Sequence, residues 1–158
     1  MCSKNKIEIM PATKQDVPHI LNIVKQAFVQ YCSAIGITTI AALCETEQDI
    51  LDDMRQKEIY IAYCDGVPVG SIRLKVNEDS AFISRFSILP EYQSLGIGSE
   101  ILSFVDGLLT AYGVKQVELY SAIENQRLQE FYTRNGFKVI SIDSSRGYQR
   151  GLLQKKYQ

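Results

Sequence analysis

The stretch Arg85–Ser99, RFSILPEYQSLGIGS, constrains the fold of this chain more than any other segment. It reads as a buried strand that stops at Pro90, turns, and leads through two glycines into a helix. The first backbone N–H groups of a helix have no partner inside it, so a turn of this kind presents unpaired donors at the helix start. Such a helix start is a natural binding site for phosphate groups.

Strands and helices alternate around this stretch in an order that predicts the class of fold. The hydrophobic periodicity predicts strands at 7–10, 58–63, 67–76, 81–89, 116–120, 137–143 and 148–155. It predicts helices that begin after Thr13 and at 45–56, 98–112 and 125–134, with residues 31–44 as an irregular, half-buried loop. We therefore expect one domain over residues 1–158, a mixed α/β (α+β) fold with a mostly antiparallel sheet of about seven strands flanked by four helices.

The hexapeptide QSLGIG at Gln93–Gly98 lacks the signatures of two common phosphate loops. It does not end in the Lys-Ser/Thr pair of a nucleoside-triphosphate loop, and it lacks the third glycine of a dinucleotide-binding turn. Taken alone, it is also compatible with a tight turn into a helix that binds no ligand. Its context is more specific, because Asn125 and the segment FYTRNGF at Phe131–Phe137 follow it along the chain.

Taken together, these segments resemble the GNAT superfamily of acyl-CoA-dependent N-acetyltransferases. The family's Q/R-x-x-G-x-G/A pyrophosphate loop is matched by QSLGIG, and Ile88-Leu89-Pro90 precedes it as the family's hydrophobic-x-Pro. The family's asparagine with a downstream tyrosine is matched by Asn125 and Tyr132 in ENQRLQEFYTRNGF. The resemblance in element order extends over 7–155. It implies the fold of that superfamily, with acetyl-CoA as co-substrate and no metal.

The resemblance also implies roles for individual residues. Backbone N–H groups of Gln93–Ser99 would bind the pyrophosphate of CoA, and the backbone of Phe86–Ile88 would bind the pantetheine arm as an added strand does. Tyr132 would be the catalytic residue beside the CoA sulfur, donating a proton or a hydrogen bond; the alternative is an aromatic residue that only packs in the core. The residues expected to bind the cofactor are Phe86, Ser87, Ile88, Gln93, Ser94, Leu95, Gly96, Ile97, Gly98, Ser99 and Asn125.

The general base stays unassigned at this stage. Some family members place a glutamate five residues before the asparagine, and this chain has Tyr120 at that position. Glu118 lies on the same strand face as Tyr120 by alternation, and Glu124 precedes the asparagine. Both carboxylates are equally compatible with solvated surface positions, and a water chain or a water held by Tyr120 is as plausible.

The acceptor is also open, and a small molecule, a peptide N-terminus and a protein lysine are all compatible with the sequence. Tyr31, residues 35–44 and the closing strands around Tyr148 are expected to line its pocket. No cysteine has a His–Asp partner that would activate it, so we expect direct attack of the amine on the thioester in a ternary complex. The alternative from another class is a module that senses acyl-CoA without turnover.

Composition and charge disfavour several other classes of protein. A formal net charge of −1 lacks the basic surplus of a nucleic-acid-binding protein, and no apolar run reaches the about 20 residues of a spanning helix. A single histidine and four irregularly spaced cysteines disfavour a zinc site and favour reduced cysteines. With no apolar signal segment at the start, we expect a cytoplasmic protein without a membrane partner. The apolar stretch 31–44 permits a homodimer.

Overall fold

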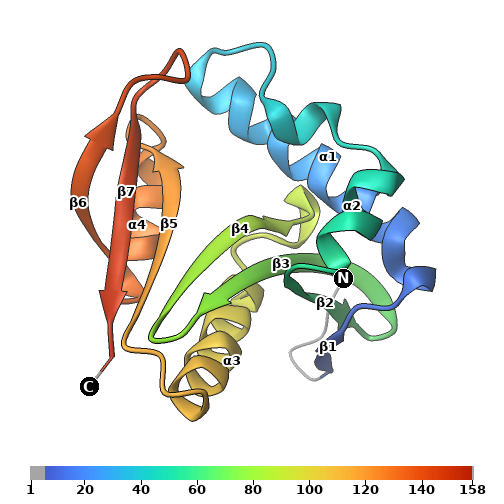
Figure 1. Cartoon of the computed structure of the whole chain (residues 1–158). Helices are drawn as coiled ribbons and strands as arrows, with labels where there is room; N and C mark the ends of the chain where they lie inside the picture. Colours follow the sequence, from blue (N-terminus) through green and yellow to red (C-terminus); the bar gives the residue numbers. More distant parts are fainter. Residues whose placement is uncertain (1–5, 158) are drawn as a thin grey trace.

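The computed structural model describes residues 6–157, and its elements follow the order that the sequence predicts (Figure 1). The strands are β1 (Ile7–Pro11), β2 (Glu58–Cys64), β3 (Val67–Asn77), β4 (Ser80–Ile88), β5 (Gln116–Ala122), β6 (Lys138–Asp143) and β7 (Arg150–Lys156). The α-helices are α1 (Val17–Ile35), α2 (Glu47–Met54), α3 (Ile97–Ala111) and α4 (Gln126–Arg134). Three short 3-10 helices are η1 (Lys14–Asp16), η2 (Ala41–Cys44) and η3 (Pro90–Tyr92).

All strands join one seven-stranded sheet in the order β1-β2-β3-β4-β5-β7-β6. Neighbouring strands are antiparallel except β4 and β5, which are parallel. The predicted fold, a mostly antiparallel sheet flanked by four helices, is therefore confirmed.

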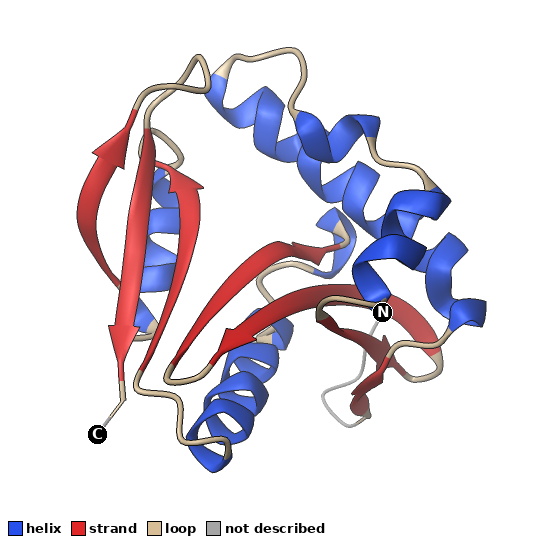
Figure 2. Cartoon of the chain, viewed as in Figure 1, coloured by secondary structure: helices blue, strands red, loops and turns tan. Residues whose placement is uncertain are grey.

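The parallel pair in the middle of the sheet is incomplete. Ser80–Phe82 pairs with Gln116–Glu118, and the pairing of the two strands ends there. Figure 2 shows that the two strands then diverge, β4 toward α1 and β5 toward β7 and α4. Within residues 6–157, no strand covers this edge of the C-terminal half of β4, and the opening positions the candidate site.

The sheet packs against helices on both faces, as β2 illustrates. Tyr60, Ala62 and Cys64 belong to the core that contains α3, whereas Ile59 and Ile61 belong to the core that contains α1 and α2. This alternation is the two-residue period of a strand that is buried on both sides. The buried stripe of α3 is formed by Ile97, Ile101, Leu102, Val105 and Leu109.

The predicted loop from residue 31 is wrong over its first turn, because α1 continues to Ile35. The helix ends at Gly36, whose φ of 75° is left-handed. Tyr31 and Cys32 extend the packed face of the helix: the Tyr31 ring lies 5.3 Å from the ring of Phe28, and Cys32 is buried. Only a short loop then separates α1 from η2. Tyr31 therefore belongs to a helix and not to a loop.

A buried ion-pair network ties the segment before α2 to the sheet. Arg73 on β3 is fully buried, and its guanidinium donates to both carboxylate oxygens of Glu45, at 2.6 and 2.7 Å. It also donates to Asp53 at 2.9 Å, and Arg85 Nε lies 3.4 Å from Glu45. Because an unpaired buried charge is costly, each member depends on the others. The sequence analysis did not identify this network.

The described cysteines differ in their chemical state. Cys32 and Cys44 are free thiols, the first buried and the second exposed. Cys64 is disulfide-bonded, so the prediction of reduced cysteines is wrong at this residue, and Cys2 lies outside the described residues. Among the helices within residues 6–157, none is both long enough and apolar enough to cross a bilayer.

Candidate active site

The turn between η3 and α3 leaves a run of backbone donors unpaired. Gly96 caps the start of α3 with a left-handed φ of 85°. The first hydrogen bond into this helix runs from Glu100 N to Gly96 O, at 3.1 Å. Within residues 6–157, the N–H groups of Ser94–Ser99 donate to no protein acceptor. A Cβ on Gly96 would meet no atom within 4 Å, so an anion can approach this backbone from outside.

Gly98 has a packing role that differs from the role of Gly96. A Cβ at position 98 would come within 2.9 Å of Phe131 Cζ on α4. Close by, Asn135 Nδ2 donates to Ser99 Oγ at 3.4 Å. The start of α3 and the end of α4 therefore lie close together because residue 98 has no side chain. The sequence analysis connected Gly98 only with the cofactor.

The C-terminal half of β4 contains a bulge. Ser71 pairs with Ser87 and Arg73 pairs with Ser84, so one residue of β3 faces two residues of β4 between these pairs. Arg85 lies in the bulge with a left-handed φ of 50°. The bulge changes the direction in which the backbone N–H and C=O groups of the following residues point. It lies in the part of β4 that no longer pairs with β5.

Beyond the bulge, alternate backbone groups face the uncovered edge of β4. Leu89 N donates to a carbonyl of β3 at 2.8 Å, so the backbone groups of Ser87 also point to β3. Those of Phe86 and Ile88 consequently point to the open side. Gln93 Nε2 donates to Ile88 O at 3.0 Å. It thereby fixes residues 93–99, which are predicted to bind phosphate and which we call the phosphate turn, to this edge.

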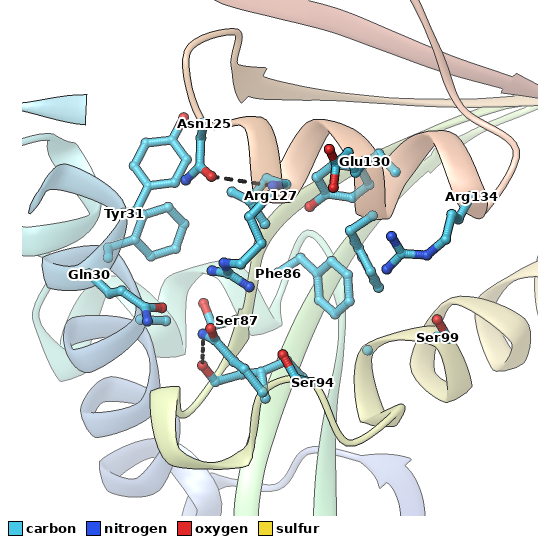
Figure 3. A pocket seen from close by; sticks show the side chains of 18 of the residues that line it. Gln30, Tyr31, Phe86, Ser87, Ser94, Ser99, Asn125, Arg127, Glu130 and Arg134 are labelled. Atoms are coloured by element: carbon cyan, nitrogen blue, oxygen red, sulfur yellow. Dashed lines mark hydrogen bonds between the residues drawn. The ribbon is translucent and has the colours of Figure 1, made fainter. Parts of the chain in front are cut away.

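A cavity of about 390 Å³ lies between the phosphate turn, the edge of β4 and α4, and we call it the first cavity (Figure 3). It brings together ten of the residues singled out in the sequence: Phe86, Ser87, Ile88, Gln93, Ser94, Gly96, Gly98, Ser99, Asn125 and Tyr132. Leu95 and Ile97 do not line it, since the Leu95 side chain is 45% exposed and that of Ile97 packs in the core. At these two positions only the backbone N–H can serve a ligand.

Tyr132 lies on α4 among aromatic rings. The ring centroids of Phe131 and Phe137 lie 5.2 and 5.7 Å from that of Tyr132, and the Phe86 centroid lies at 6.5 Å. Burial raises the pKa of the Tyr132 phenol well above its ordinary value. In the described part of the chain its hydroxyl has no hydrogen-bond partner. A protonated hydroxyl with a free O–H therefore lines the first cavity.

Asn125 has a structural role in addition to any role in binding. It caps α4, and its Oδ1 accepts a hydrogen bond from Leu128 N at 3.3 Å. The residue is buried and lines the first cavity. Its Nδ2 donates to no described residue, so this amide group is available to a ligand.

A second cavity, of about 370 Å³, lies between β4, β5 and the loop before β7. Five residues line both cavities: Phe28, Tyr31, Phe86, Leu128 and Tyr132. The face of α4 that carries Leu128 and Tyr132 therefore lies where the two cavities meet.

Tyr31 links the two sides of the cleft. Its hydroxyl accepts a hydrogen bond from Ala122 N on β5 at 2.8 Å and lies 3.3 Å from the hydroxyl of Tyr148. Burial raises the pKa of the Tyr31 phenol above its ordinary value, so the group stays protonated. Tyr148 lies in the loop before β7, which begins at Arg150 rather than at residue 148 as expected. Both tyrosines line the second cavity.

The two carboxylates considered as a general base, and Tyr120 as the residue that could hold a water, lie in different places. Tyr120 lines the second cavity, with its ring 5.8 Å from that of Phe82. Glu118 accepts a hydrogen bond from Gln154 Nε2 at 2.9 Å and lines neither cavity. Glu124 is exposed and also outside both cavities. Of the three side chains, only that of Tyr120 is placed to touch an acceptor.

The sequence analysis missed two arginines of α4. Arg127 and Arg134 line the first cavity, and Figure 3 shows their side chains directed from α4 toward the phosphate turn. They are spaced about two helical turns apart and so share a face with one another. Two arginines seven residues apart, on the helix that begins after Asn125, are the sequence pattern that could have identified these cavity residues. Residues 6–157 contain no group of three His, Cys, Asp or Glu side chains that could hold a metal ion.

The chain matches the family model described as Acetyltransferase (GNAT) family over residues 25–137. A curated relative, the spermidine N(1)-acetyltransferase of Thermoplasma acidophilum, is 31% identical over 97 residues. The aligned part covers 61% of this chain and 58% of the relative. The match thus spans little more than half of the length of that relative.

Solved structures share the fold over nearly their whole length. The PaiA N-acetyltransferase from T. acidophilum, solved in complex with coenzyme A, has a TM-score of 0.85 at 22% identity, covering 96% of this chain and 99% of that chain. Ard1 from Thermoplasma volcanium has a TM-score of 0.81 at 18% identity, covering 96% of this chain and 98% of that chain. The family match includes the phosphate turn, Asn125 and Tyr132, and it covers more than half of the sequence. This chain belongs to the acetyltransferase (GNAT) family.

Proposed function

We propose that this protein transfers the acetyl group of acetyl-CoA to a primary amine. The observation that carries the proposal is the meeting of two cavities at Tyr132, one bounded by the phosphate turn and the other lying between β4 and β5. Direct transfer requires that both substrates reach one point from different sides, in a fixed orientation. When bound, acetyl-CoA supplies the acetyl group as an activated thioester.

The first cavity has the groups that the phosphates of CoA require. The free N–H groups of Ser94–Ser99 and the positive end of α3 favour a pyrophosphate. Arg127 and Arg134 add charge from the opposite wall. The open space around Gly96 allows the anion to approach the backbone closely.

The edge of β4 has the groups that an extended amide-bearing arm requires. The backbone groups of Phe86 and the N–H of Ile88 face the cleft without a strand among residues 6–157 to pair with them, whereas Ile88 O already accepts from Gln93 Nε2. An added strand-like ligand would satisfy them, and the free amide of Asn125 would donate to the same arm. The ring of Phe86 lies 6.5 Å from that of Tyr132, and the N–H of Phe86 is our candidate for polarising the thioester carbonyl.

Tyr132 stabilises the departing sulfur by donating a hydrogen bond. A thiol has an ordinary pKa of about 8.5 and a tyrosine one of about 10. Burial raises the pKa of Tyr132 further, so full transfer of its proton to the sulfur is unfavourable. The hydroxyl therefore lowers the charge on the sulfur without ionising, and the proton gained by the sulfur comes in the end from the amine.

The second cavity helps the amine to arrive unprotonated without a carboxylate base. Among residues 6–157, no Asp or Glu lines this cavity, whereas three arginines do. Neighbouring positive charge disfavours the ammonium form and lowers the pKa of an amine. We therefore assign no side-chain base, and the amine releases its proton to water near Tyr120.

The name of the curated relative, a spermidine N(1)-acetyltransferase, supports an amine nitrogen as the atom that is acetylated. The coenzyme A in the PaiA structure supports the cofactor. A sensor that binds acyl-CoA without turnover would need the first cavity only. The second cavity, which opens at the same hydroxyl, favours the enzyme.

Two measurements on the purified protein test the proposal together. Isothermal titration with acetyl-CoA should show saturable binding, and a thiol-release assay over a panel of primary amines should show release that depends on the amine. Binding without release on every amine would favour the sensor. No binding would contradict both functions.

A further inference from the structure

Arginine side chains give the second cavity a net positive charge. Arg85, Arg146 and Arg150 line it, and no carboxylate within residues 6–157 does. Arg85 is paired with Glu45 at 3.4 Å. Arg150 is paired with Asp143 at 2.7 Å, and both carboxylates lie outside the cavity lining. Arg146 is exposed and forms no ion pair with any described residue, so its charge is not offset.

Two polar groups of the same cavity have unused hydrogen-bonding capacity. The guanidinium carbon of Arg150 lies 3.9 Å from the centroid of the Tyr120 ring, and the buried Nε has no partner among the described residues. Ser121 is 2% exposed, lines the cavity, and its Oγ also lacks a partner there. Arginine nitrogens donate only, and a hydroxyl can donate as well. Both of these atoms are buried, so the donors that face a ligand are led by the guanidinium N–H groups of the exposed Arg146. A carboxylate needs such donors, and an ammonium group cannot use them.

The cavity is also limited in size. Figure 1 shows the loop before β7 meeting the C-terminal end of α1 across the cleft, where Tyr31 and Tyr148 are in contact. This contact bridges the two walls beside the cavity. A volume of about 370 Å³ beneath such a bridge suits a small molecule better than a protein chain.

We propose that the acceptor is a small primary amine that also carries a carboxylate, bound through Arg146 and Arg150, and that it is not a polyamine. The inference rests on the proposed acetyl transfer and names the substrate class of that site. A carboxylate forms charge-assisted hydrogen bonds with guanidinium groups. The second cation of a polyamine would instead lie near three arginines with no carboxylate in the lining to pair with it.

The transfer step is balanced without a further reactant. The neutral amine nitrogen forms a bond to the acetyl carbon, and the bond from that carbon to sulfur breaks. The sulfur leaves with the electron pair, and it gains the equivalent of the proton that the nitrogen loses. The products are an N-acetylated carboxylate and free CoA thiol.

The test compares amines in matched pairs, each an amino acid and the amine that lacks its carboxylate, together with spermidine. Thiol release by the wild-type protein should give a kcat/KM about 10–100-fold higher for the carboxylate-bearing member, since a hydrogen bond to a charged group contributes about 1.5–3 kcal/mol. Arg146→Gln should reduce this ratio about tenfold or more, mainly through KM. Arg146→Glu should shift the preference toward spermidine.

An exposed arginine outside both cavities supplies the matched control. Arg55→Gln should leave the ratio unchanged, and thermal unfolding should show that all variants fold. Faster turnover of spermidine than of every carboxylate-bearing amine would overturn the inference and leave the proposed acetyl transfer intact. An unchanged ratio in Arg146→Gln would overturn the assigned site. No turnover of any amine would defeat the proposed function and the inference together.

Discussion

The two cavities are built from different parts of the polypeptide. The first binds through backbone groups, namely the N–H groups of Ser94–Ser99 and the edge at Phe86 and Ile88. The second is lined by side chains from α1, η2, β4, β5, α4, the loop before β7 and the start of β7. Backbone groups are the same at every position, so the phosphate turn and the β4 edge constrain the sequence mainly where shape requires glycine or proline. The first cavity adds only a few side chains, such as those of Asn125 and Tyr132. The second depends on the identity of each side chain.

This difference explains what each cavity reveals. A few residues at fixed spacing in the first cavity identify the cofactor that the whole family shares. The arginines and tyrosines of the second cavity, which we propose to bind the acceptor, form no motif. Changes to the first cavity should therefore alter acetyl-CoA binding, and changes to the second should alter the choice of amine.

The largest effect is expected at Tyr132, where the two cavities meet. Tyr132→Phe should lower kcat about 10²–10³-fold, as loss of one donor to a developing charge does, and leave acetyl-CoA affinity nearly unchanged. Because burial raises its pKa, the hydroxyl stays protonated, so the wild-type rate should not fall through its ionisation below pH about 10. Steady-state kinetics from neutral to alkaline pH measure kcat and its pH dependence, and titration calorimetry measures the affinity for acetyl-CoA.

The control for this substitution is Tyr60→Phe. Tyr60 is similarly buried, its hydroxyl donates to Glu58 at 2.8 Å, and it lies outside both cavities. Its kcat should match the wild type. An equal loss in both variants, or no loss in Tyr132→Phe, would reduce Tyr132 to a packing residue.

The second prediction separates backbone recognition from backbone strain. Gly96→Val should weaken acetyl-CoA binding about 100-fold, because its side chain displaces the anion from at least two N–H donors worth about 1.5 kcal/mol each. Gly113→Val is the matched control, since Gly113 has a similar left-handed φ of 81° with no atom within 4 Å of its Cβ position. It lies just beyond the opposite end of α3. Calorimetry should show weak acetyl-CoA binding only for Gly96→Val. Wild-type affinity in this variant would refute the assignment of the phosphate turn as the pyrophosphate-binding site.

The third prediction concerns the ion-pair network that supports the second cavity. Arg73→Met should lower the free energy of unfolding by about 3 kcal/mol, because Glu45 remains buried with only Arg85 beside it. Urea unfolding measures this change, and Arg55→Met, at an exposed site, should change it by less than about 0.5 kcal/mol. In the folded variant, KM for the amine should rise more than the Kd for acetyl-CoA. A larger rise in the Kd for acetyl-CoA than in KM for the amine would contradict the assignment of the second cavity to the amine.

The smallest effect is expected at Asn125, where structure and binding can be separated. Asn125→Ala should lower the free energy of unfolding by about 1 kcal/mol, because the cap of α4 is lost. Asn125→Ser should preserve the cap and the stability. Both variants lack Nδ2 and should bind acetyl-CoA about 2–10-fold more weakly. Full affinity in Asn125→Ser would restrict this residue to capping.

The sequence predicts the fold well where the signal is local. The order of elements follows from periodicity, and the phosphate turn follows from Pro90 and the glycines. The end of α1 was missed because its last turn packs through Tyr31 and Cys32, whose neighbours GITT look irregular. The parallel pairing of β4 with β5, and its early loss, depends on tertiary packing and has no local signature.

The site shows the same limit. The spacing of the phosphate turn, Asn125 and Tyr132 identified most of the first cavity, since these residues form a family motif. The backbone of Phe86–Ile88 was predicted to bind the cofactor arm. Beyond the bulge at Arg85, however, the backbone groups of Ser87 point to β3, and no residue of β4 predicts this bulge. Arg73 and Glu45 are far apart in sequence, so their pairing appears only in three dimensions.

A structure with acetyl-CoA bound tests the central claim most directly. We expect the pyrophosphate on the N–H groups of Ser94–Ser99 and the thioester at the junction of the two cavities. Its sulfur should lie within hydrogen-bonding distance of the Tyr132 hydroxyl, with the acetyl group facing the second cavity. A thioester that lies away from Tyr132, or an acetyl group that points away from the arginine-lined cavity, would contradict the account.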